Sequence, residues 1–451
     1  MIDSKQLKET GKPESEARAF QSFEETQMFL HTSWRENMKR RTAVAVAAIL
    51  AASMATPAMA ATDLTVFNSK SEIQTQFEDE AAAYSDEKGV NMTVAMSNDP
   101  VITHMGTRYA SNNPYALSMV DAKDVYSLTP DHGIDLADLD AAKDTDYAIV
   151  IDGKVAAIPF CIEARGLMYN KTKIEEVTGE EFKPEDYKTL DAFKELCQKI
   201  ADSGEVEAPV AIMKEDWSLA AHYLAQVVEE HEDPEAFAND LVAGNVDLMG
   251  DPQFTSLMDT FDVLKEYNYA KDDAVNADRN KSEDMLAWGD VCFMFGGNWD
   301  WSLIVQSESD CELGMMPVPQ NTDTDANTKL VGGGSKYFFI DNSVSEEEQQ
   351  AAKDFLNWQA EDPEGQKFVS ETCALVSPYK ANTLEVSDPL SKSVKAYADE
   401  GALIDNYNFF PDDHITKAGA IMQEYLGDQI DRQGLADELT EYWKGATLVE
   451  H

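Results

Sequence analysis

The sequence predicts an α/β protein, and three observations support this. Residues 64–67 read as a short apolar strand, and a helical pattern and a second, alternating strand at residues 90–94 follow it, which makes a βαβ unit. Residues 291–295 form an apolar run without alternation, typical of a strand covered on both faces. The chain has 451 residues, 43% of them hydrophobic, which is enough for two or three domains.

The first predicted helix follows a loop at residues 68–72. Its apolar residues recur on one helical face: Ile73, Phe77, Ala81 and Tyr84. Gly89 is placed to end this helix, and Ser71 with Gln74 has the spacing of a capping box at its start. The loop therefore lies at the carboxyl end of the first strand, where open α/β sheets bind ligands.

The apolar strand at residues 291–295 leads through Gly296 and Gly297 into a segment that we call the tryptophan loop, residues 298–301. It carries Asn298, Trp299, Asp300 and Trp301. Indoles stack on the apolar faces of sugar rings, and amide and carboxylate groups hydrogen-bond ring hydroxyls. From these residues alone, two ordinary core tryptophans are the more frequent outcome for such a segment, with a ligand-binding loop as the alternative.

Further elements follow along the chain. Asp152-Gly153 between two apolar runs is a strong hairpin signal. Trp217 lies at the start of a predicted helix that follows a strand at residues 209–213, and Ser345 with Glu348 has the spacing of another capping box. Asp412 or Asp413 is placed to cap a late helix.

The first 60 residues predict an export signal. Residues 1–37 are polar, and Met38, which lies directly before a basic cluster, is the expected start. An apolar segment at residues 43–55 and the A-x-A site Ala58-Met59-Ala60 form a signal peptide cleaved after Ala60. The mature protein is expected to be soluble outside the cytoplasm, periplasmic or at the cell surface. No cysteine lies at the cleavage region to anchor a lipid.

Charge and cysteine usage exclude several functions. With 36 basic and 84 acidic residues the net charge is −48, which disfavours nucleic acid and anionic membranes as partners. A cationic ligand would be attracted, although an acidic surface also keeps a secreted protein soluble. The 5 cysteines are widely spaced, without C-x-x-C, and read as core residues. No histidines have metal-ligand spacing, so neither a metal nor a cofactor is expected.

Several motifs resemble one family. Residues 159–171 are similar to the signature P-x-x-x-E-A-x-x-L-x-Y-N-K of the maltose-binding-protein-like family 1 extracellular solute-binding proteins, the sugar-binding components of ABC transporters. The stretch NSK-x-E-I from Asn68, the G-N-W-x-W of the tryptophan loop and D-P-E-G-Q at residues 362–366 resemble the same family. Tyr115 departs from it, because relatives usually carry Asp there.

The resemblance implies a type II periplasmic-binding-protein fold, in which three crossovers join two α/β lobes. After residues 1–60, lobe 1 is expected at residues 61–161 plus 320–374, and lobe 2 at residues 165–316 plus 378–446. Glu163 would bind ligand in the cleft, with an ion pair to Arg165 as the alternative. The full set of expected ligand contacts is Lys70, Glu72, Glu163, Trp217, Asn298, Trp299, Trp301, Gly333 and Asp412.

The resemblance also implies a function. A monomeric, non-enzymatic protein would close on a sugar or oligosaccharide and deliver it to the membrane permease of an ABC importer. Two alternatives stay open. The first is a binder of a cationic molecule such as a polyamine, favoured by the net charge. The second is a secreted glycosidase, which would use paired carboxylates near aromatic residues.

Overall fold

The computed structural model describes residues 61–322 and 324–449, which belong to one compact unit, Ala61–His451. The predicted signal peptide and start site fall on residues 1–60, outside the described residues. Within the described ranges, no helix combines the length and the apolar character needed to span a membrane.

Ten strands form one mixed sheet in the described part of the chain, in the order β2-β1-β3-β9-β5-β7-β6, with β10 beside β9 and both β4 and β8 beside β5. The strands are β1 (Asp63–Asn68), β2 (Asn91–Ala95), β3 (Leu117–Val120), β4 (Ile149–Ile151), β5 (Lys154–Asn170), β6 (Val210–Ala211), β7 (Phe293–Gly297), β8 (Leu313–Met316), β9 (Leu330–Ile340) and β10 (Leu403–Ile404).

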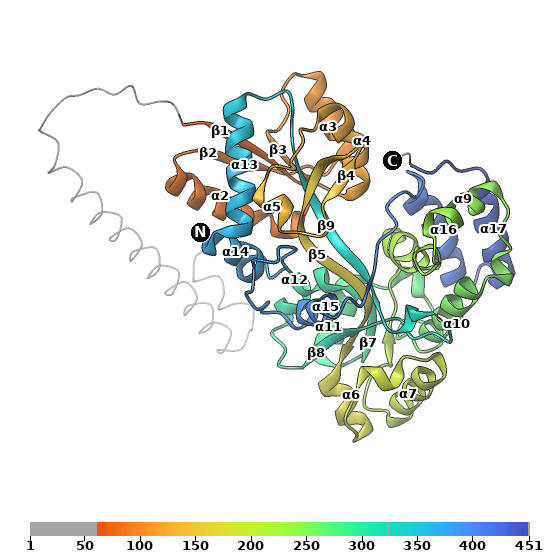
Figure 1. The fold of residues 1–451 in the computed structure, drawn as a ribbon. Helices are drawn as coiled ribbons and strands as arrows, with labels where there is room; N and C mark the ends of the chain where they lie inside the picture. The colour runs from red at the N-terminus through yellow and green to blue at the C-terminus, as the bar shows by residue number, and fades with distance from the viewer. Residues whose placement is uncertain (1–60, 323, 450–451) are drawn as a thin grey trace, which may run out of the picture. The chain divides into compact units, whose positions relative to one another are not determined.

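Helices surround this sheet (Figure 1). The α-helices are α2 (Gln74–Lys88), α3 (Val101–Ala110), α4 (Ala122–His132), α5 (Asp140–Lys143), α6 (Lys171–Thr178), α7 (Leu190–Ser203), α8 (Gln226–Glu229), α9 (Pro234–Ala243), α10 (Pro252–Glu266), α11 (Arg279–Trp288), α12 (Trp301–Ile304), α13 (Glu346–Glu361), α14 (Pro363–Lys367), α15 (Pro389–Asp399), α16 (His414–Leu426) and α17 (Arg432–Lys444). The π-helical segments are η4 (Ser218–Leu224) and η10 (Phe368–Thr372). The 3-10 segments are η2 (Ser71–Ile73), η3 (Pro184–Tyr187), η5 (Leu248–Gly250), η6 (Ala274–Asn276), η7 (Asn298–Asp300), η8 (Val305–Ser307) and η9 (Asp325–Asn327).

The predicted βαβ unit is confirmed. β1 pairs in parallel with β2, and α2 between them buries Phe77, Ala81 and Tyr84 and ends at Gly89, whose φ of 72° is left-handed. The capping box at Ser71 was wrong, because residues 71–73 form a 3-10 turn without a side-chain cap. The Gln74 side chain instead accepts a hydrogen bond from Asn68 Nδ2 at 2.8 Å.

Two local predictions are confirmed at other turns. Asp152 and Gly153, with φ of 50° and 78°, join the antiparallel strands β4 and β5. Ser345 and Glu348 cap each other at the start of α13. Asp413 occupies the N-cap position of α16, but its side chain does not cap the helix, because it accepts a hydrogen bond from the Tyr442 hydroxyl at 3.1 Å.

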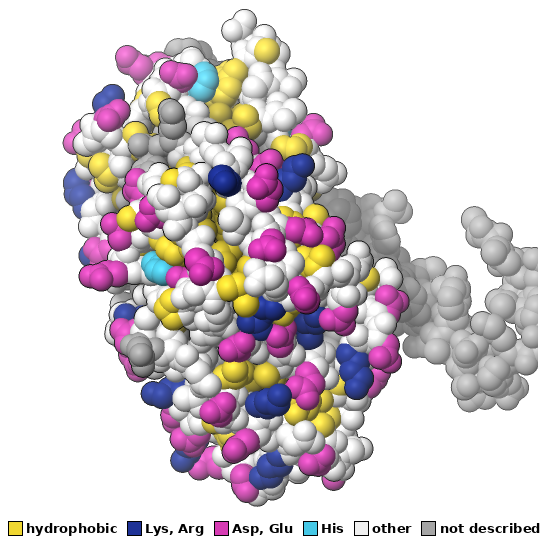
Figure 2. Space-filling model, turned by 90° about the vertical axis from the view of Figure 1, so that its right-hand side faces the viewer, with side chains coloured by type: hydrophobic (Ala, Val, Ile, Leu, Met, Phe, Trp, Pro, Cys, Tyr) yellow, Lys and Arg dark blue, Asp and Glu magenta, His cyan; other side chains and the backbone are white. Residues whose placement is uncertain are grey.

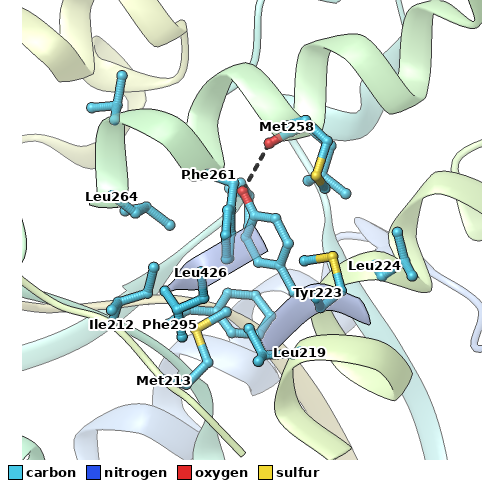
Figure 3. Packing of buried hydrophobic residues seen from close by; sticks show 14 of the residues in the cluster. Ile212, Met213, Leu219, Tyr223, Leu224, Met258, Phe261, Leu264, Phe295 and Leu426 are labelled. Carbon is cyan, nitrogen blue, oxygen red and sulfur yellow. Dashed lines mark hydrogen bonds between the residues drawn. The ribbon is translucent and has the colours of Figure 1, made fainter. Parts of the chain in front are cut away.

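The chain folds into two lobes, each around its own apolar core. The first lobe packs around residues from two separate stretches of the chain, including Leu64, Phe77, Phe338 and Phe355. The second lobe packs around Tyr223 and its neighbours, where the Tyr223 hydroxyl donates to the Leu257 carbonyl at 2.9 Å (Figure 3). Because the Tyr223 hydroxyl has this partner, the phenol can be buried at low cost.

Three segments cross between the lobes. Residues 158–165 of β5 pair antiparallel with β9, so that Glu163 lies opposite Gly333, and the two strands run side by side through the molecule (Figure 1). Farther along, residues 165–170 of β5 pair with β7 and β8 in the second lobe. The Ile162 N–H donates to the carbonyl of Val376, on the third segment, at 2.8 Å.

The strand before the tryptophan loop differs from the prediction in two ways. β7 includes Gly296 and Gly297, which were expected to end it. It pairs in parallel with β6 but antiparallel with β5, so the sheet is mixed rather than parallel at this point. A side chain at Gly297 would collide with the Trp299 ring, since an added Cβ would lie 2.3 Å from it.

The cysteines are free thiols, and four of the five are buried, as predicted for core residues. Among the described residues, no group of three or more histidine, cysteine or carboxylate side chains is arranged so that it could hold a metal ion. Acidic side chains are scattered over the face drawn in Figure 2, with lysines and arginines between them.

Candidate ligand-binding site

A cavity of about 530 Å³ lies where the crossovers β5 and β9 meet residues of both lobes. This volume falls within the ordinary range for small-molecule sites, about 300–1,000 Å³. Its lining includes Lys70, Glu72, Asp121, Lys123, Glu163, Arg165, Trp217, His222, Glu229, Trp299, Gly334, Ser335, Lys336, Tyr337, Asn406, Tyr407, Asn408, Phe410, Asp412 and His414. A hollow of about 870 Å³ lies elsewhere on the first lobe, between α2 and α13, and carries none of the predicted site residues.

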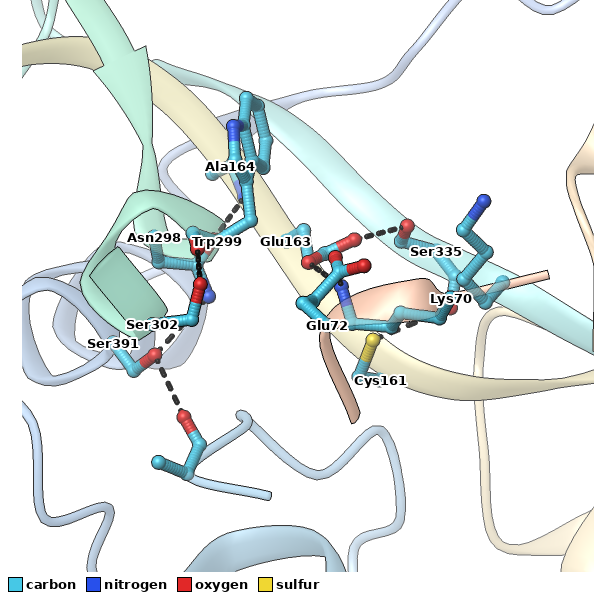
Figure 4. A network of polar contacts seen from close by, with 12 residues as sticks. Lys70, Glu72, Cys161, Glu163, Ala164, Asn298, Trp299, Ser302, Ser335 and Ser391 are labelled. Atoms are coloured by element: carbon cyan, nitrogen blue, oxygen red, sulfur yellow. Dashed lines mark hydrogen bonds and ion pairs between the residues drawn. The ribbon is translucent and has the colours of Figure 1, made fainter. Parts of the chain in front are cut away.

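The side of the cavity that we call the charged wall consists of Lys70, Glu72, Glu163 and Ser335 (Figure 4). Lys70 Nζ lies 2.6 Å from Glu163 Oε1 and 2.7 Å from Glu72 Oε1. The Ser335 hydroxyl donates to Glu163 Oε2 at 2.5 Å. Both oxygens of Glu163 are therefore already engaged by groups of the protein.

The loop after β1 fixes Lys70 in this place. The Asn68 side chain accepts from the Lys70 N–H at 2.8 Å and donates to the Lys70 carbonyl at 3.0 Å. The Lys70 side chain is 1% exposed. Burial alone would lower its pKa, but Glu163 and Glu72 outweigh burial and raise the pKa above its usual range. Burial likewise favours the neutral form of Glu72, yet Lys70 lowers the pKa of that carboxyl.

The other cations of the lining are also paired. Lys336 Nζ lies 2.6 Å from Asp121 Oδ1, and Lys336 adopts a left-handed conformation with φ of 50°. Lys123 contacts Asp124 at 2.6 Å. The Arg165 guanidinium forms an ion pair with buried Glu229, rather than with Glu163 as the alternative reading of the sequence had it.

The opposite side, which we call the aromatic wall, consists of Trp217, His222, Trp299, Tyr407 and Phe410. The His222 ring lies 4.8 Å from the Trp299 ring and 5.2 Å from the Trp217 ring. Three buried polar atoms of this wall, Trp299 Nε1, His222 Nδ1 and the Tyr407 hydroxyl, have no hydrogen-bond partner among the described residues. Unpaired buried polar atoms are costly, so a hydrogen bond from a ligand to any of these three would be stabilising.

The aromatic wall rests on an irregular helix and on Arg165. His222 belongs to the π-helical segment η4, a helix type that is frequent at functional sites. Arg165 Nε donates to the His222 carbonyl at 2.9 Å, and its guanidinium also contacts Asn406. Through these hydrogen bonds, Arg165 of β5 contacts both η4 and the segment that contains Tyr407.

Burial keeps the polar rings of this wall neutral. Burial lowers the pKa of His222 well below its usual value, and Arg165 adds to the effect. Burial also raises the pKa of Tyr407 to about 12, and it lowers the pKa of His414, whose ring stacks on Phe410 of the wall, to about 4. Near neutral pH the wall therefore presents uncharged rings.

The structure brings six of the nine predicted site residues to the cavity, and these are Lys70, Glu72, Glu163, Trp217, Trp299 and Asp412. The other three do not line it. Asn298 is buried behind the tryptophan loop, where its side chain accepts from the Ala164 N–H and donates to Ser391 Oγ, both at 3.1 Å. Trp301 packs against a core cluster, and Gly333 pairs within the sheet while Gly334 reaches the cavity.

Sequence reasoning missed other lining residues, among them Asp121, His222, Glu229, Lys336, Tyr407 and Phe410. The aromatic segment at residues 407–410, just before the Pro411-Asp412 pair, carried a usable signal, because clustered aromatics in a polar stretch favour a binding surface.

This geometry defines a class: a two-lobed binding protein whose crossovers carry the ligand cavity. The chain belongs to the bacterial extracellular solute-binding protein family, whose sequence profile matches residues 102–399. It is a solute-binding protein rather than an enzyme. No curated protein shows significant sequence similarity to the chain.

Solved structures share the fold. Ligand-free RafE from Streptococcus pneumoniae is similar with a TM-score of 0.69 and 18% identity, covering 86% of this chain and 98% of RafE. The binding protein MsmE from Bacillus subtilis, in an open conformation, has a TM-score of 0.68 and 20% identity over 85% of this chain and 97% of that one. A sugar transporter from Bacillus licheniformis in complex with stachyose has a TM-score of 0.65 and 18% identity over 85% and 99% of the two chains. These similarities establish the type II solute-binding fold.

Proposed function

We propose that the protein binds a neutral oligosaccharide in the cavity and delivers it to the permease of an ABC importer. The observation that carries the proposal is the aromatic wall with its three unpaired polar atoms, which faces a wall of charged but mutually paired groups. A sugar ring offers an apolar face to indoles and a rim of hydroxyls to polar atoms.

Each part of the cavity has a role in this binding mode. The Trp217 and Trp299 indoles stack on sugar rings. Trp299 Nε1 donates to a ligand oxygen, and the Tyr407 hydroxyl and His222 Nδ1 exchange hydrogen bonds with ligand hydroxyls. Glu72, one third exposed, accepts further hydroxyl hydrogens. The oligosaccharides bound to structural relatives, raffinose in RafE and stachyose in the Bacillus licheniformis protein, support a ligand of this class.

The charge of the lining does not favour a polyamine. Four basic residues, Lys70, Lys123, Arg165 and Lys336, stand against five acidic ones, Glu72, Asp121, Glu163, Glu229 and Asp412. Apart from Asp412 on the exposed rim, each carboxylate is within ion-pair distance of a lysine or arginine. A cationic ligand would have to compete with these internal partners, whereas a neutral one leaves them intact.

A glycosidase is not supported either. Such an enzyme needs one carboxyl that stays protonated as a general acid. Glu72 and Glu163 share one ammonium group, that of Lys70, and Lys70 lowers the pKa of Glu72. This arrangement favours the ionised form of Glu72.

The lobes are proposed to consist of residues 61–161 plus 320–374 and residues 165–316 plus 378–446, and to close on the ligand. The apolar cores support this division, since one cluster draws on residues 64–161 and 338–379 and the other on residues 167–318 and 407–443. A ligand that touches both walls would favour the closed state.

We also propose that the protein is exported and that it interacts with a membrane permease. The protein acts outside the cytoplasm as a monomer, periplasmic or at the cell surface, after cleavage near Ala60. Membership in an extracellular family supports export. Transfer to a membrane permease completes the proposed role.

A thermal-shift screen tests the ligand class, with raffinose, stachyose and mannobiose as neutral probes and spermidine as the cationic probe. A ligand that binds only the folded state stabilises it by about 2.7 kcal/mol at 100 times its dissociation constant. We expect an oligosaccharide to raise the melting temperature at both low and high salt. A shift with spermidine that salt abolishes would instead favour the cationic class.

A further inference from the structure

Arg279, which does not line the cavity, contacts one cavity tryptophan and the turn that carries the other. It is the first residue of α11, and Asp278 caps this helix by accepting from the Lys281 N–H at 2.8 Å. Its side chain is 13% exposed. A charged side chain held so far from solvent needs close partners.

Three carboxylates surround the guanidinium. Arg279 Nη2 lies 2.6 Å from Asp300, Nε lies 3.1 Å from Glu283, and Nη1 lies 3.2 Å from Glu215. Asp300 and Glu283 are 3% and 1% exposed. The planar guanidinium can engage three partners at fixed angles, which a lysine ammonium on a flexible stem does not reproduce.

The same guanidinium contacts the aromatic wall at Trp217. Its central carbon lies 4.7 Å from the centroid of the Trp217 ring, a cation–π contact. Trp217 lines the cavity, so this contact supports the indole from outside it. The orientation of the Trp217 ring thus depends on a residue that touches no ligand.

Asp300 connects Arg279 to the second tryptophan. One Asp300 oxygen binds Arg279, and the other accepts from the Gly297 N–H at 3.0 Å. These two contacts close the turn that projects Trp299 against Gly297. Burial raises the pKa of both Glu283 and Asp300, and the Arg279 guanidinium opposes this rise at each carboxyl.

We propose that Arg279 is a positioning residue for the binding site: it holds the Trp217 ring directly and the Trp299 turn through Asp300, so that both indoles are oriented before a ligand arrives. The inference rests on the proposed function for its effect on sugar affinity, but its effect on the two indoles is independent of any ligand. Orienting groups in advance lowers the entropic cost of binding.

A ligand-free measurement tests this positioning. In protein labelled with 5-fluorotryptophan, Trp217→Phe and Trp299→Phe assign the two fluorine resonances. We expect Arg279→Lys to shift or broaden both resonances. The matched control is Arg432→Lys, because Arg432 also binds two carboxylates, Asp259 and Asp262, and lies 6.0 Å from the Tyr425 ring, away from the cavity. The control should leave both resonances in place.

Calorimetry with raffinose, stachyose and mannobiose then measures the effect on binding. For any probe that the wild type binds, Arg279→Lys should lower the affinity by about tenfold. The Arg432→Lys control should keep wild-type affinity. If the wild type binds none of the probes, the proposed sugar function fails, and the fluorine spectra alone still decide the role of Arg279.

Superimposable Trp217 and Trp299 resonances in Arg279→Lys and wild type would overturn the proposal, even if the variant melted at a lower temperature. Should Arg279→Lys fail to fold, Asp300→Asn provides the second test. It should move the Trp299 resonance more than the Trp217 resonance, and an unmoved Trp299 resonance would contradict the proposal.

Discussion

The two walls of the cavity differ in whether their polar groups have partners within the protein. On the charged wall, Lys70, Glu163 and Ser335 saturate one another, so the buried charges are stable without a ligand. On the aromatic wall, Trp299 Nε1 and the Tyr407 hydroxyl have no partner among the described residues. The difference indicates that the charged wall fixes the crossover between lobes, while the aromatic wall is left incomplete for the ligand.

The largest expected effect is a loss of stability when the ion pairs of the charged wall are removed. Lys70→Met leaves Glu163 buried and without its cation, and such losses cost about 3–5 kcal/mol of unfolding free energy. Urea denaturation measures it. Lys194→Met is the matched control, because the Lys194–Glu266 pair is about half exposed and should be worth no more than about 1 kcal/mol. Equal losses in the two variants would mean that the buried cluster does not stabilise the fold.

The next effect falls on the aromatic wall. Trp299→Ala removes one face of the cavity and should weaken the binding of a neutral oligosaccharide by about 2–4 kcal/mol, measured by calorimetry with raffinose or stachyose. If Trp299 served mainly as a core residue, unfolding free energy would instead fall by about 3–5 kcal/mol while affinity stayed constant.

A smaller effect concerns the neutrality of the aromatic wall. Burial lowers the pKa of His222 in the folded protein. At a pH below the unfolded-state pKa of about 6.5, His222 is therefore protonated in the unfolded chain but stays neutral in the folded protein. Stability is therefore lost as pH falls. His222→Gln should reduce the loss between pH 7.5 and pH 5 by at most about 2 kcal/mol. An unchanged pH dependence in chemical denaturation would show that His222 titrates normally in the fold.

The smallest effect separates the ligand classes. Asp412 is exposed at the rim, so Asp412→Asn should alter the affinity for a neutral oligosaccharide by less than about threefold. Spermidine affinity that falls much more in this variant than in wild type would favour the cationic alternative.

The features that could be predicted from the sequence are those set by residues close together along the chain. Periodicity located α2, the Asp152-Gly153 turn followed from its residue types, and the capping box at Ser345 followed from its spacing. The partner of Glu163 could not be predicted, because Lys70 lies 93 positions away and reaches it only through the sheet. Sequence reasoning had weighed only Arg165, two positions along the chain.

The tryptophan loop illustrates the same limit. Four polar or aromatic residues in a row identified the segment, but the sequence does not specify which of them face the cavity. The 3-10 turn at Asn298–Asp300 directs Trp299 to the cavity and Asn298 into the protein. The role of Arg279 could not be predicted from the sequence, because it depends on contacts with Asp300 and Glu215, which lie 21 and 64 positions away.

The central claim is that one neutral oligosaccharide contacts both walls, and small-angle X-ray scattering with and without ligand tests it most directly. A ligand held between the charged and aromatic walls should draw the lobes together, so the radius of gyration should decrease at saturation with raffinose or stachyose. An unchanged radius, with calorimetry showing the site to be full, would contradict the account and place the sugar on one wall alone.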